Sequence, residues 1–348
     1  MKWSALIAVL AAGGLAASAV AQQPGAPGPA AAATAAARRP ILLPPPEPIE
    51  HITGNVYKIF GGGGNTLVVV QKAGVVLVDT KMPGNGQAIL DEVKKVTDKP
   101  VVLIINTHSH PDHIGSTDTI RAKYPNVQVV MHENTKKEIL AGPFNKPELL
   151  PTRTYTDRLT LGQGADRIEL YHTGPGHTQG DTFVLFPASH VLFMGDVMAW
   201  NMAPFLPSGG ASAIADEIDK LVAEVKGVDI VVEGHGYVNT WQGLQRFARF
   251  NRALIKDARA AYDRGDPPAA AVAELQKVPE FAPLLDTQIK KGLEYGNTPL
   301  ARANMNVNVA YQEFAGEKVT TANGAPLPAT DKHKGSDPKD TAPPPRPS

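Results

Sequence analysis

The chain of 348 residues contains no cysteine. This absence excludes disulfide bonds, a cysteine nucleophile, cysteine ligands to zinc and a cysteine for lipid attachment. The chain also lacks an excess of either charge, because Lys plus Arg and Asp plus Glu both number 34 and the formal net charge is +0. A balanced charge offers no electrostatic footprint for wrapping nucleic acid, so we expect no nucleic-acid partner.

The amino-terminal segment differs in composition from the rest of the chain. Lys2 and an apolar run over residues 6–17 precede an Ala-Val-Ala tripeptide and Gln22, a pattern typical of a secretory signal peptide. An uncleaved membrane anchor is the alternative, and the cleavage pattern disfavours it. We therefore predict a signal peptide over residues 1–21, no stable membrane association after its removal, and a periplasmic or secreted protein.

Two further segments are unlike a folded core. Residues 22–48 are rich in Ala, Pro and Gly, and residues 317–348 are similar. Such segments bury little apolar surface, so we predict a linker and a disordered tail. The hydrophobic fraction of 43% is nevertheless ample for a packed core between them. We assign residues 49–240 to a main domain and residues 241–316 to a helical C-terminal extension.

Short apolar runs alternate with helical patterns in the main domain. The continuous, mostly β-branched run at residues 101–105 is typical of a strand buried on both faces. We expect the other strands at residues 55–60, 66–70, 75–78, 127–131, 167–171, 182–186, 191–194 and 229–232. Helices are expected at residues 87–96, 118–124, 213–225 and 241–264, and over most of residues 268–314. This alternation predicts an α/β fold built in layers.

The most informative segment directly follows the predicted strand at residues 101–105. It contains His108, His110, Asp112 and His113. Residues two apart in an extended chain point the same way, so His108 and His110 are placed to hold one metal together. If the chain turns into a helix near Asp112, then Asp112 and His113 face a second metal. Imidazole and carboxylate groups suit zinc or another divalent ion.

Three more residues of the ligand type follow predicted strands further along the chain. His177 lies in a Gly-Pro-Gly-His-Thr loop, Asp196 follows a glycine, and His235 lies between two glycines. Ligands in α/β folds converge at the carboxyl ends of strands, and a neighbouring glycine permits close approach of the backbone. A single histidine is commonly a surface or core residue, but the series as a whole predicts a metal site.

The series His-x-His-x-Asp-His, Gly-His-Thr, Gly-Asp and Gly-His-Gly resembles the metallo-beta-lactamase superfamily over residues 49–237. The resemblance implies an αββα metallo-beta-lactamase sandwich with a two-metal site at one edge, between the sheets. It implies a first zinc held by His108, His110 and His177, and a second zinc held by Asp112, His113 and His235. Asp196 would bridge the two. Asp79 matches a position that supports the site rather than binding metal.

The resemblance also implies a function. We expect a dizinc hydrolase in which metal-bound hydroxide attacks an ester, thioester, lactone or lactam of a small molecule. Asp112 is expected to orient the hydroxide and to take up its proton, and Fe²⁺ or Mn²⁺ are the alternative metals. The best-known beta-lactamases of this fold have cysteine where this chain has Asp196, and the bridging aspartate resembles glyoxalase II instead.

Three alternative functions stay open. A true beta-lactamase acting on antibiotics would share the fold, and so would an iron-dependent persulfide dioxygenase, which uses only part of the ligand set. A non-enzymatic binding protein would be expected to lack a ligand, and none is missing from the sequence. The sequence indicates neither the substrate nor the oligomeric state.

Two weaker signals have two interpretations each. The glycines at residues 61–64 indicate either a mobile flap over the site or a simple hairpin turn. The apolar residues that follow Asp196, among them Trp200, Met202, Phe205 and Leu206, form either a substrate wall or ordinary loop packing.

Overall fold

The computed structural model describes residues 45–206, 210–286 and 298–317. The predicted signal peptide, most of the predicted linker and nearly all of the predicted tail lie outside these ranges. None of the helices within them has the length and apolar character needed to cross a membrane.

The first of two sheets has seven strands in the order β1 to β7. Its first four strands pair antiparallel, and β4, β5, β6 and β7 pair in parallel. The strands are β1 (Glu50–Thr53), β2 (Val56–Ile59), β3 (Thr66–Val70), β4 (Val75–Val78), β5 (Val101–Ile105), β6 (Gln128–His132) and β7 (Arg153–Tyr155). The carboxyl ends of β4 and β5 therefore meet at one edge, where the His108–His113 segment begins.

The second sheet has six strands in the order β13-β12-β11-β10-β9-β8. Only β11 and β12 pair in parallel, so these two strands also bring their carboxyl ends together. The strands are β8 (Arg158–Leu161), β9 (Ile168–Tyr171), β10 (Phe183–Phe186), β11 (Val191–Phe193), β12 (Ile230–Val232) and β13 (Val238–Thr240).

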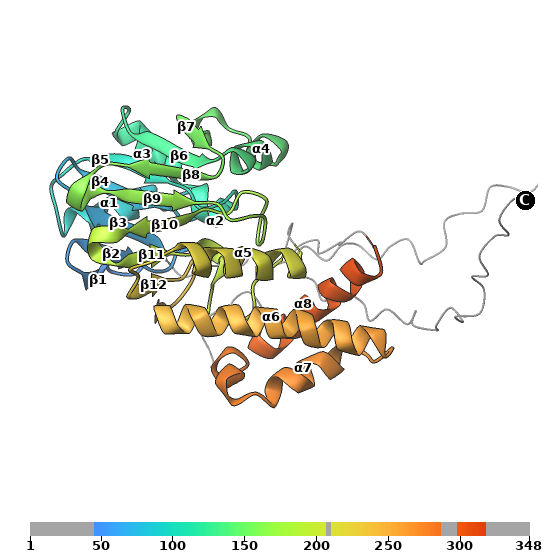
Figure 1. The fold of residues 1–348 in the computed structure, drawn as a ribbon. Helices are drawn as coiled ribbons and strands as arrows, with labels where there is room; N and C mark the ends of the chain where they lie inside the picture. The colour runs from blue at the N-terminus through green and yellow to red at the C-terminus, as the bar shows by residue number, and fades with distance from the viewer. Residues whose placement is uncertain (1–44, 207–209, 287–297, 318–348) are drawn as a thin grey trace, which may run out of the picture. The chain divides into compact units, whose positions relative to one another are not determined.

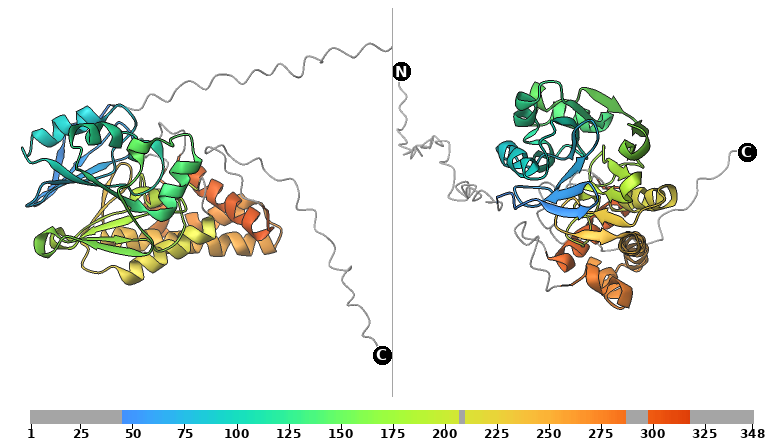
Figure 2. Two further views of the ribbon diagram at one scale, coloured as in Figure 1. Left: turned by 90° about the horizontal axis from the view of Figure 1, so that it is seen from above. Right: turned by 90° about the vertical axis from the view of Figure 1, so that its left-hand side faces the viewer.

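Side chains of the first sheet alternate between two apolar layers, as the two-residue period of a strand requires. Leu67 and Val69 face the second sheet, where they pack with Val184 and Phe193, whereas Val68 faces the opposite way. The outer layer is closed by helices α1 (Gly86–Lys94), α2 (Pro111–Ile114), α3 (Thr117–Lys123) and α4 (Glu133–Ala141). Figure 2 shows these helices on one side of the sheets and the yellow and orange helices on the other.

Helix α5 (Ala211–Glu224) covers the outer face of the second sheet. Its Ile214, Ile218 and Leu221 recur at helical spacing and pack in one cluster with Leu185 and Leu192 of that sheet. The layers therefore run helix, sheet, sheet, helix, which confirms the αββα sandwich that the sequence predicts.

The C-terminal helices pack into the same apolar cluster as α5. Helix α6 (Trp241–Asp263) begins at Thr240, whose side chain accepts a hydrogen bond from Gly243 N, and contributes Leu244 and Phe247. It is followed by α7 (Pro268–Gln276) and α8 (Pro299–Phe314), and Figure 1 shows the three helices grouped beside α5. The extension therefore shares a hydrophobic core with the second sheet rather than having a separate one.

Each strand and helix predicted within the described residues is present, and strand ends differ by at most one residue. The sequence missed β1, β7, β8 and β13, which are short and expose polar side chains, and also helix α4. The predicted linker needs one correction, because its last residues are docked on the sheet. Glu47 N donates a hydrogen bond to Phe60 O at 2.7 Å, so ordered structure begins before residue 49.

We predict that Phe247→Ala lowers the free energy of unfolding by about 3–5 kcal/mol, because the ring is fully buried and its removal leaves a cavity. Since α6 shares its core with the second sheet, chemical denaturation should still show one transition. The control is Lys256→Ala on the exposed side of the same helix, which should change stability by at most about 0.5 kcal/mol. Two separate transitions would contradict the shared core.

Candidate metal centre

The His108–His113 segment crosses the end of β5. It leaves the strand at Ile105, and α2 begins at Pro111, with His110 as its N-cap. The side chains of His108 and His110 point the same way, and Nε2 of His108 lies 3.0 Å from Nδ1 of His110. The turn into α2 directs Asp112 and His113 to a second position, as the sequence predicts for a helix starting here.

Loops from the second sheet complete the site. His177 lies in the connection from β9 to β10, Asp196 lies in a 3₁₀ turn after β11, and His235 lies in the turn between β12 and β13. Gly234 N bonds to Gly195 O at 2.9 Å, which joins the Asp196 and His235 loops directly. The two sheets therefore deliver all seven predicted ligands to one edge of the sandwich.

One group of side chains comprises His108, His110, His177 and Asp196, whose ligand atoms lie within 4.8 Å of one another. Nε2 of His177 lies 3.0 Å from Nδ1 of His110 and 3.3 Å from Nε2 of His108. Tetrahedral zinc with Zn–N bonds of about 2.0–2.1 Å separates its ligand atoms by about 3.3 Å. The three imidazoles therefore have the spacing of a tetrahedral zinc site.

A second group comprises Asp112, His113 and His235, again with ligand atoms within 4.8 Å. Nε2 of His235 lies 3.3 Å from Nε2 of His113 and 3.2 Å from Oδ2 of Asp112. Asp196 reaches this group as well, since its Oδ1 lies 3.2 Å from His113 Nε2 and its Oδ2 lies 3.3 Å from His235 Nε2. Asp196 is thus the side chain that the two groups share.

The ring nitrogens that face away from the site have partners of their own. Nδ1 of His108 lies 2.9 Å from Thr107 Oγ1, and Nδ1 of His177 lies 2.6 Å from the carbonyl oxygen of Phe205. Such partners fix the orientation and tautomer of an imidazole that binds metal through its other nitrogen. The sequence gives no signal for the Phe205 contact, because every residue has the same backbone carbonyl group.

Asp79 is the buried acid behind the second group. Its Oδ2 lies 2.7 Å from Nδ1 of His113 and accepts from Thr107 Oγ1 at 2.7 Å, and its Oδ1 accepts from Thr107 N at 2.8 Å. Its φ of 63° lies in the left-handed region that non-glycine residues rarely adopt. This backbone turn at the end of β4 aims the carboxylate at the rear of the His113 ring, away from the converging ligand atoms.

Burial and neighbouring charge divide the histidines into two classes. Burial lowers the pKa of His108 and His110, and burial with the nearby His110 lowers the pKa of His177 to about 3. Burial opposes charge on His113 and His235 too, but the carboxylates of Asp196 and Asp112 outweigh it. The pKa of His113 is therefore held well above its usual range, and that of His235 is raised to about 9.

Divalent metal fits both groups. In the described part of the chain, Oδ1 of Asp196 is buried without a hydrogen bond of good geometry, and lone pairs of three mostly neutral imidazoles converge on one point. Neutral imidazoles so arranged repel one another unless a cation lies between them. The donor set holds only nitrogen and oxygen atoms, which suits zinc, and also iron or manganese.

The glycines at residues 61–64 are buried, so the flap interpretation is wrong. Gly64 N donates to Asp112 O at 3.0 Å, and a β-carbon on Gly64 would collide with the His113 ring. Lys81 Nζ, also fully buried, donates to the carbonyl oxygens of Ile59 at 2.8 Å and Gly64 at 2.9 Å. The run is therefore a fixed wall of backbone against the candidate ligands.

The apolar residues after Asp196 lie beside the site. The indole of Trp200 stacks on the His235 ring, with centroids 5.8 Å apart and planes at 26°. Trp200 and Asn201 have φ of 57° and 49°, and Glu233 accepts a hydrogen bond from Asn201 N at 2.9 Å, which stabilises this unusual turn. The sequence did not single out Glu233, although it lies two residues before His235.

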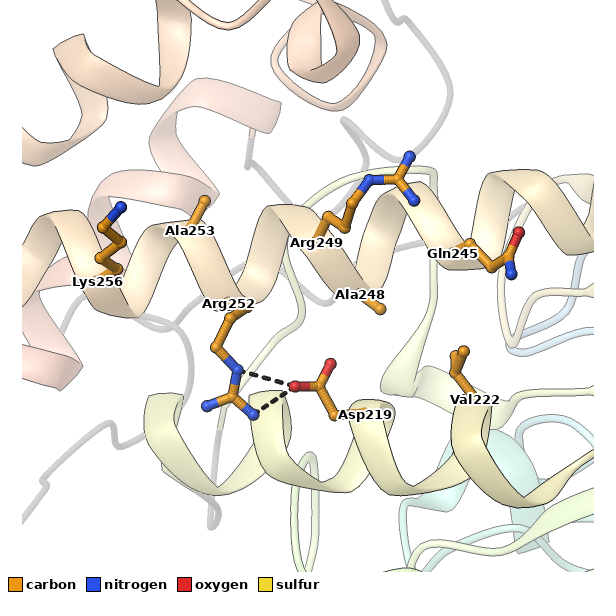
Figure 3. A pocket seen from close by; sticks show the side chains of 8 residues that line it. All are labelled: Asp219, Val222, Gln245, Ala248, Arg249, Arg252, Ala253 and Lys256. Carbon is orange, nitrogen blue, oxygen red and sulfur yellow. Dashed lines mark hydrogen bonds and ion pairs between the residues drawn. The ribbon is translucent and has the colours of Figure 1, made fainter.

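Two other features lie apart from the seven candidate ligands. His172 stacks on His132, with ring centroids 3.8 Å apart, and does not join either group. A groove between α5 and α6, where Arg252 Nε donates to Asp219 at 2.8 Å, contains none of the candidate ligands (Figure 3).

Comparison with known proteins gives a family match over residues 59–235, more than half of the 348 residues, to the metallo-beta-lactamase superfamily. Among curated proteins, the chain is 32% identical over 162 residues to the alpha subunit of 2,4-dinitroanisole O-demethylase from Nocardioides sp., covering 44% of this chain and 48% of that protein. It is 28% identical over 202 residues to a metallo-beta-lactamase of Chryseobacterium indologenes, covering 54% of this chain and 80% of that protein. The chain thus spans about half the length of the demethylase subunit.

Solved structures resemble the fold. A stereoselective inverting sec-alkylsulfatase from Pseudomonas sp. matches with a TM-score of 0.61 and 16% identity, covering 80% of this chain and 51% of that chain. A metallo-beta-lactamase from Pontibacter korlensis matches with a TM-score of 0.50 and 22% identity, covering 60% of this chain and 99% of that chain. At such identities the likeness concerns the fold alone.

We predict that Asp79→Asn weakens zinc binding at the second group by about 10- to 100-fold, because the carboxylate behind His113 is lost while the side-chain shape is kept. Competition with a chromogenic chelator measures the affinity. The matched control is Asp229→Asn, whose side chain is 79% exposed, and which should bind zinc like the unchanged protein. Equal affinities for Asp79→Asn and the unchanged protein would contradict the supporting role.

We predict that the two groups load with metal at different pH. A metal must displace the proton from His235, whose pKa is about 9, so affinity at the second group falls as the pH drops below that value. The imidazoles of the first group hold a proton less tightly than a free imidazole, because burial lowers their pKa values, that of His177 to about 3. Zinc titrations should therefore give about one ion per chain near pH 6 and about two near pH 9. The same stoichiometry at both pH values would refute this division.

Proposed function

The chain belongs to the metallo-beta-lactamase superfamily, and from this premise we propose that it is a hydrolase that holds two zinc ions and cleaves a small molecule. The bond that it cleaves is an ester, thioester, lactone or lactam. Hydrolase-type chemistry is the common function of this superfamily, and the nature and number of the metals, the bond and the substrate are the parts that we add.

The observation that carries the proposal is the position of Asp196 between the two groups. One of its oxygens lies 3.2 Å from Nε2 of His113, and the other lies 3.3 Å from His235 Nε2 and 3.8 Å from His177 Nε2. A carboxylate whose oxygens reach residues of both groups is suited to bridging two cations. A site for one metal would not need this side chain at the centre of seven ligands.

Zinc in this site would lower the pKa of a coordinated water towards about 7 and so supply hydroxide near neutral pH. The residues of the chain supply placement and proton handling. Side chains of Asp112 and Asp196 are 16% and 13% exposed, whereas those of His113 and His177 are fully buried. We assign to Asp112 the role of accepting a proton at its carboxylate, because it is a partly exposed acid that belongs to only one group.

The competing functions differ in their metals. A persulfide dioxygenase would need one iron held by the first group, and the second group of Asp112, His113 and His235 would then have no use. Beta-lactamase activity on antibiotics would use the same two groups as the proposed hydrolase, so it is a special case of the proposal. Metal content of protein prepared without chelator separates the two classes, with two zinc ions per chain expected and one iron favouring the dioxygenase.

Export is part of the same proposal. The signal pattern before Gln22 supports passage across a membrane and function in the periplasm or outside the cell. The balanced charge supports a small-molecule substrate rather than a nucleic acid.

We predict that His110→Ala lowers kcat/KM for an activated ester such as 4-nitrophenyl acetate by at least about 100-fold, because the first group loses a ligand that is worth several kcal/mol to metal-assisted hydrolysis. The measurement is the release of 4-nitrophenolate by zinc-loaded protein. His51→Ala is the control, since this exposed histidine on β1 belongs to neither group and should leave turnover unchanged. If His110→Ala hydrolyses the ester as fast as the unchanged protein, the site assignment is wrong.

A further inference from the structure

Arg302 is a buried cation that lacks a counter-ion. It lies in the first turns of α8 in the C-terminal extension and is 8% exposed. In the described part of the chain its Nε is completely enclosed without a partner. Nη1 and Nη2 are not fully enclosed, and they form no hydrogen bond or ion pair with the described residues. The guanidinium lies over the ring of Phe205 in a cation–π contact, with its central carbon 4.9 Å from the ring centroid.

Such an arrangement is unfavourable for folding alone. Arginine is almost never buried without a pair, because removing its charge from water costs more than contact with an aromatic ring returns. Burial lowers the pKa of Arg302 to about 10, so the guanidinium is still charged at neutral pH. Four arginines of the extension are exposed and paired with carboxylates, as Arg252 is with Asp216 and Asp219. Arg246 also has an enclosed Nε without a partner, but its side chain is only partly buried. The difference indicates that Arg302 is kept for a ligand.

Phe205 connects Arg302 to the candidate metal centre. The carbonyl oxygen of Phe205 accepts a hydrogen bond from Nδ1 of His177, and the ring centroids of the two residues are 6.1 Å apart. Asp196 is the acidic group whose charge acts on the Arg302 guanidinium. Arg302 therefore packs on Phe205, the residue that itself contacts His177 of the first ligand group.

The charge of Asp196 does not satisfy Arg302. No ion pair between them is formed, and the carboxylate oxygens of Asp196 face His113, His177 and His235. Cations held by those residues would take up the carboxylate charge and leave the guanidinium less compensated than before. The missing partner is therefore an anion that arrives with the ligand.

We propose that Arg302 binds an oxyanion of the substrate, a carboxylate or a sulfate, while the reacting bond lies at the metal centre. This inference rests on the proposed hydrolase function and specifies its substrate class as small anionic molecules. The planar guanidinium forms two parallel hydrogen bonds to an oxyanion, which fixes the position of the substrate as well as adding affinity. Recognition thus comes from the extension and catalysis from the sandwich.

Two esters test the proposal on zinc-loaded protein. One is neutral 4-nitrophenyl acetate, and the other is the mono-4-nitrophenyl ester of adipic acid, which adds a carboxylate too distant to attack its own ester readily. The unchanged protein should prefer the anionic ester, and Arg302→Met should lower this preference in kcat/KM by about 10- to 100-fold, mainly through KM. Arg302→Lys keeps the charge but loses the forked geometry, so its preference for the anionic ester should lie between those of the unchanged protein and Arg302→Met.

Arg252→Gln is the matched control, because it removes an arginine of the same extension that is exposed and already paired (Figure 3). Its preference for the anionic ester should equal that of the unchanged protein. Arg302→Met should unfold at the same temperature as the unchanged protein or higher, since it removes an unpaired buried charge. A large fall in that temperature would assign Arg302 a structural role and count against the proposal.

A binding measurement separates this inference from the proposed hydrolysis. Calorimetric titration with succinate, and in parallel with methyl sulfate, should show binding that Arg302→Met loses, and the tighter ligand identifies the kind of oxyanion. Succinate binding that depends on Arg302, together with no turnover of either ester, would overturn the hydrolase but support the anion site. Turnover with no preference for the anionic ester, together with equal succinate binding by Arg302→Met, would overturn the anion site alone. If Arg302→Met fails to fold, Arg302→Lys decides by the same two measurements.

Discussion

The structure depends on holding five imidazoles and two carboxylates within a few ångströms of one another in a buried place. Neutral imidazoles such as His108 and His177 repel at 3.3 Å between Nε2 atoms, and burial prevents water from separating them. The fold opposes this with contacts behind three of the rings, from Thr107 to His108, from Asp79 to His113 and from the carbonyl oxygen of Phe205 to His177. The parallel pairs β4–β5 and β11–β12 bring the loops that carry these contacts to the same edge.

Much of this arrangement could be predicted from the sequence, because the relevant signals are local. The run at residues 101–105 is apolar and β-branched, as a buried strand is, and four candidate ligand residues in the segment His108–His113 follow it directly. The spacing of two between His108 and His110 also gives their common direction. Family resemblance supplied what spacing alone did not, namely how the seven residues divide into two groups.

The remainder depends on contacts between distant parts of the chain. Every residue has a backbone carbonyl, so the sequence does not indicate that the one of Phe205 contacts His177. Lys81 resembles an ordinary surface lysine in the sequence, and only the structure shows that its Nζ donates to the carbonyl oxygens of Ile59 and Gly64. Arg302 lies 106 residues after Asp196, in a helix whose role the sequence leaves open. Short edge strands such as β8 were missed because packing and pairing, rather than their own composition, make them strands.

The glycines beside the candidate ligands limit which positions of this protein can be substituted during evolution. Gly64 against the His113 ring and Gly234 against Asp196 make one side of the centre from backbone alone, and any side chain there would displace a ligand. That side is closed to substitution, so new substrates cannot be accommodated by mutating it. Diversity has to enter through side chains near the candidate ligands, such as Trp200 beside His235 and Phe205 beside His177. Homologues with the same chemistry but different substrates should therefore vary at those positions while the glycines stay invariant.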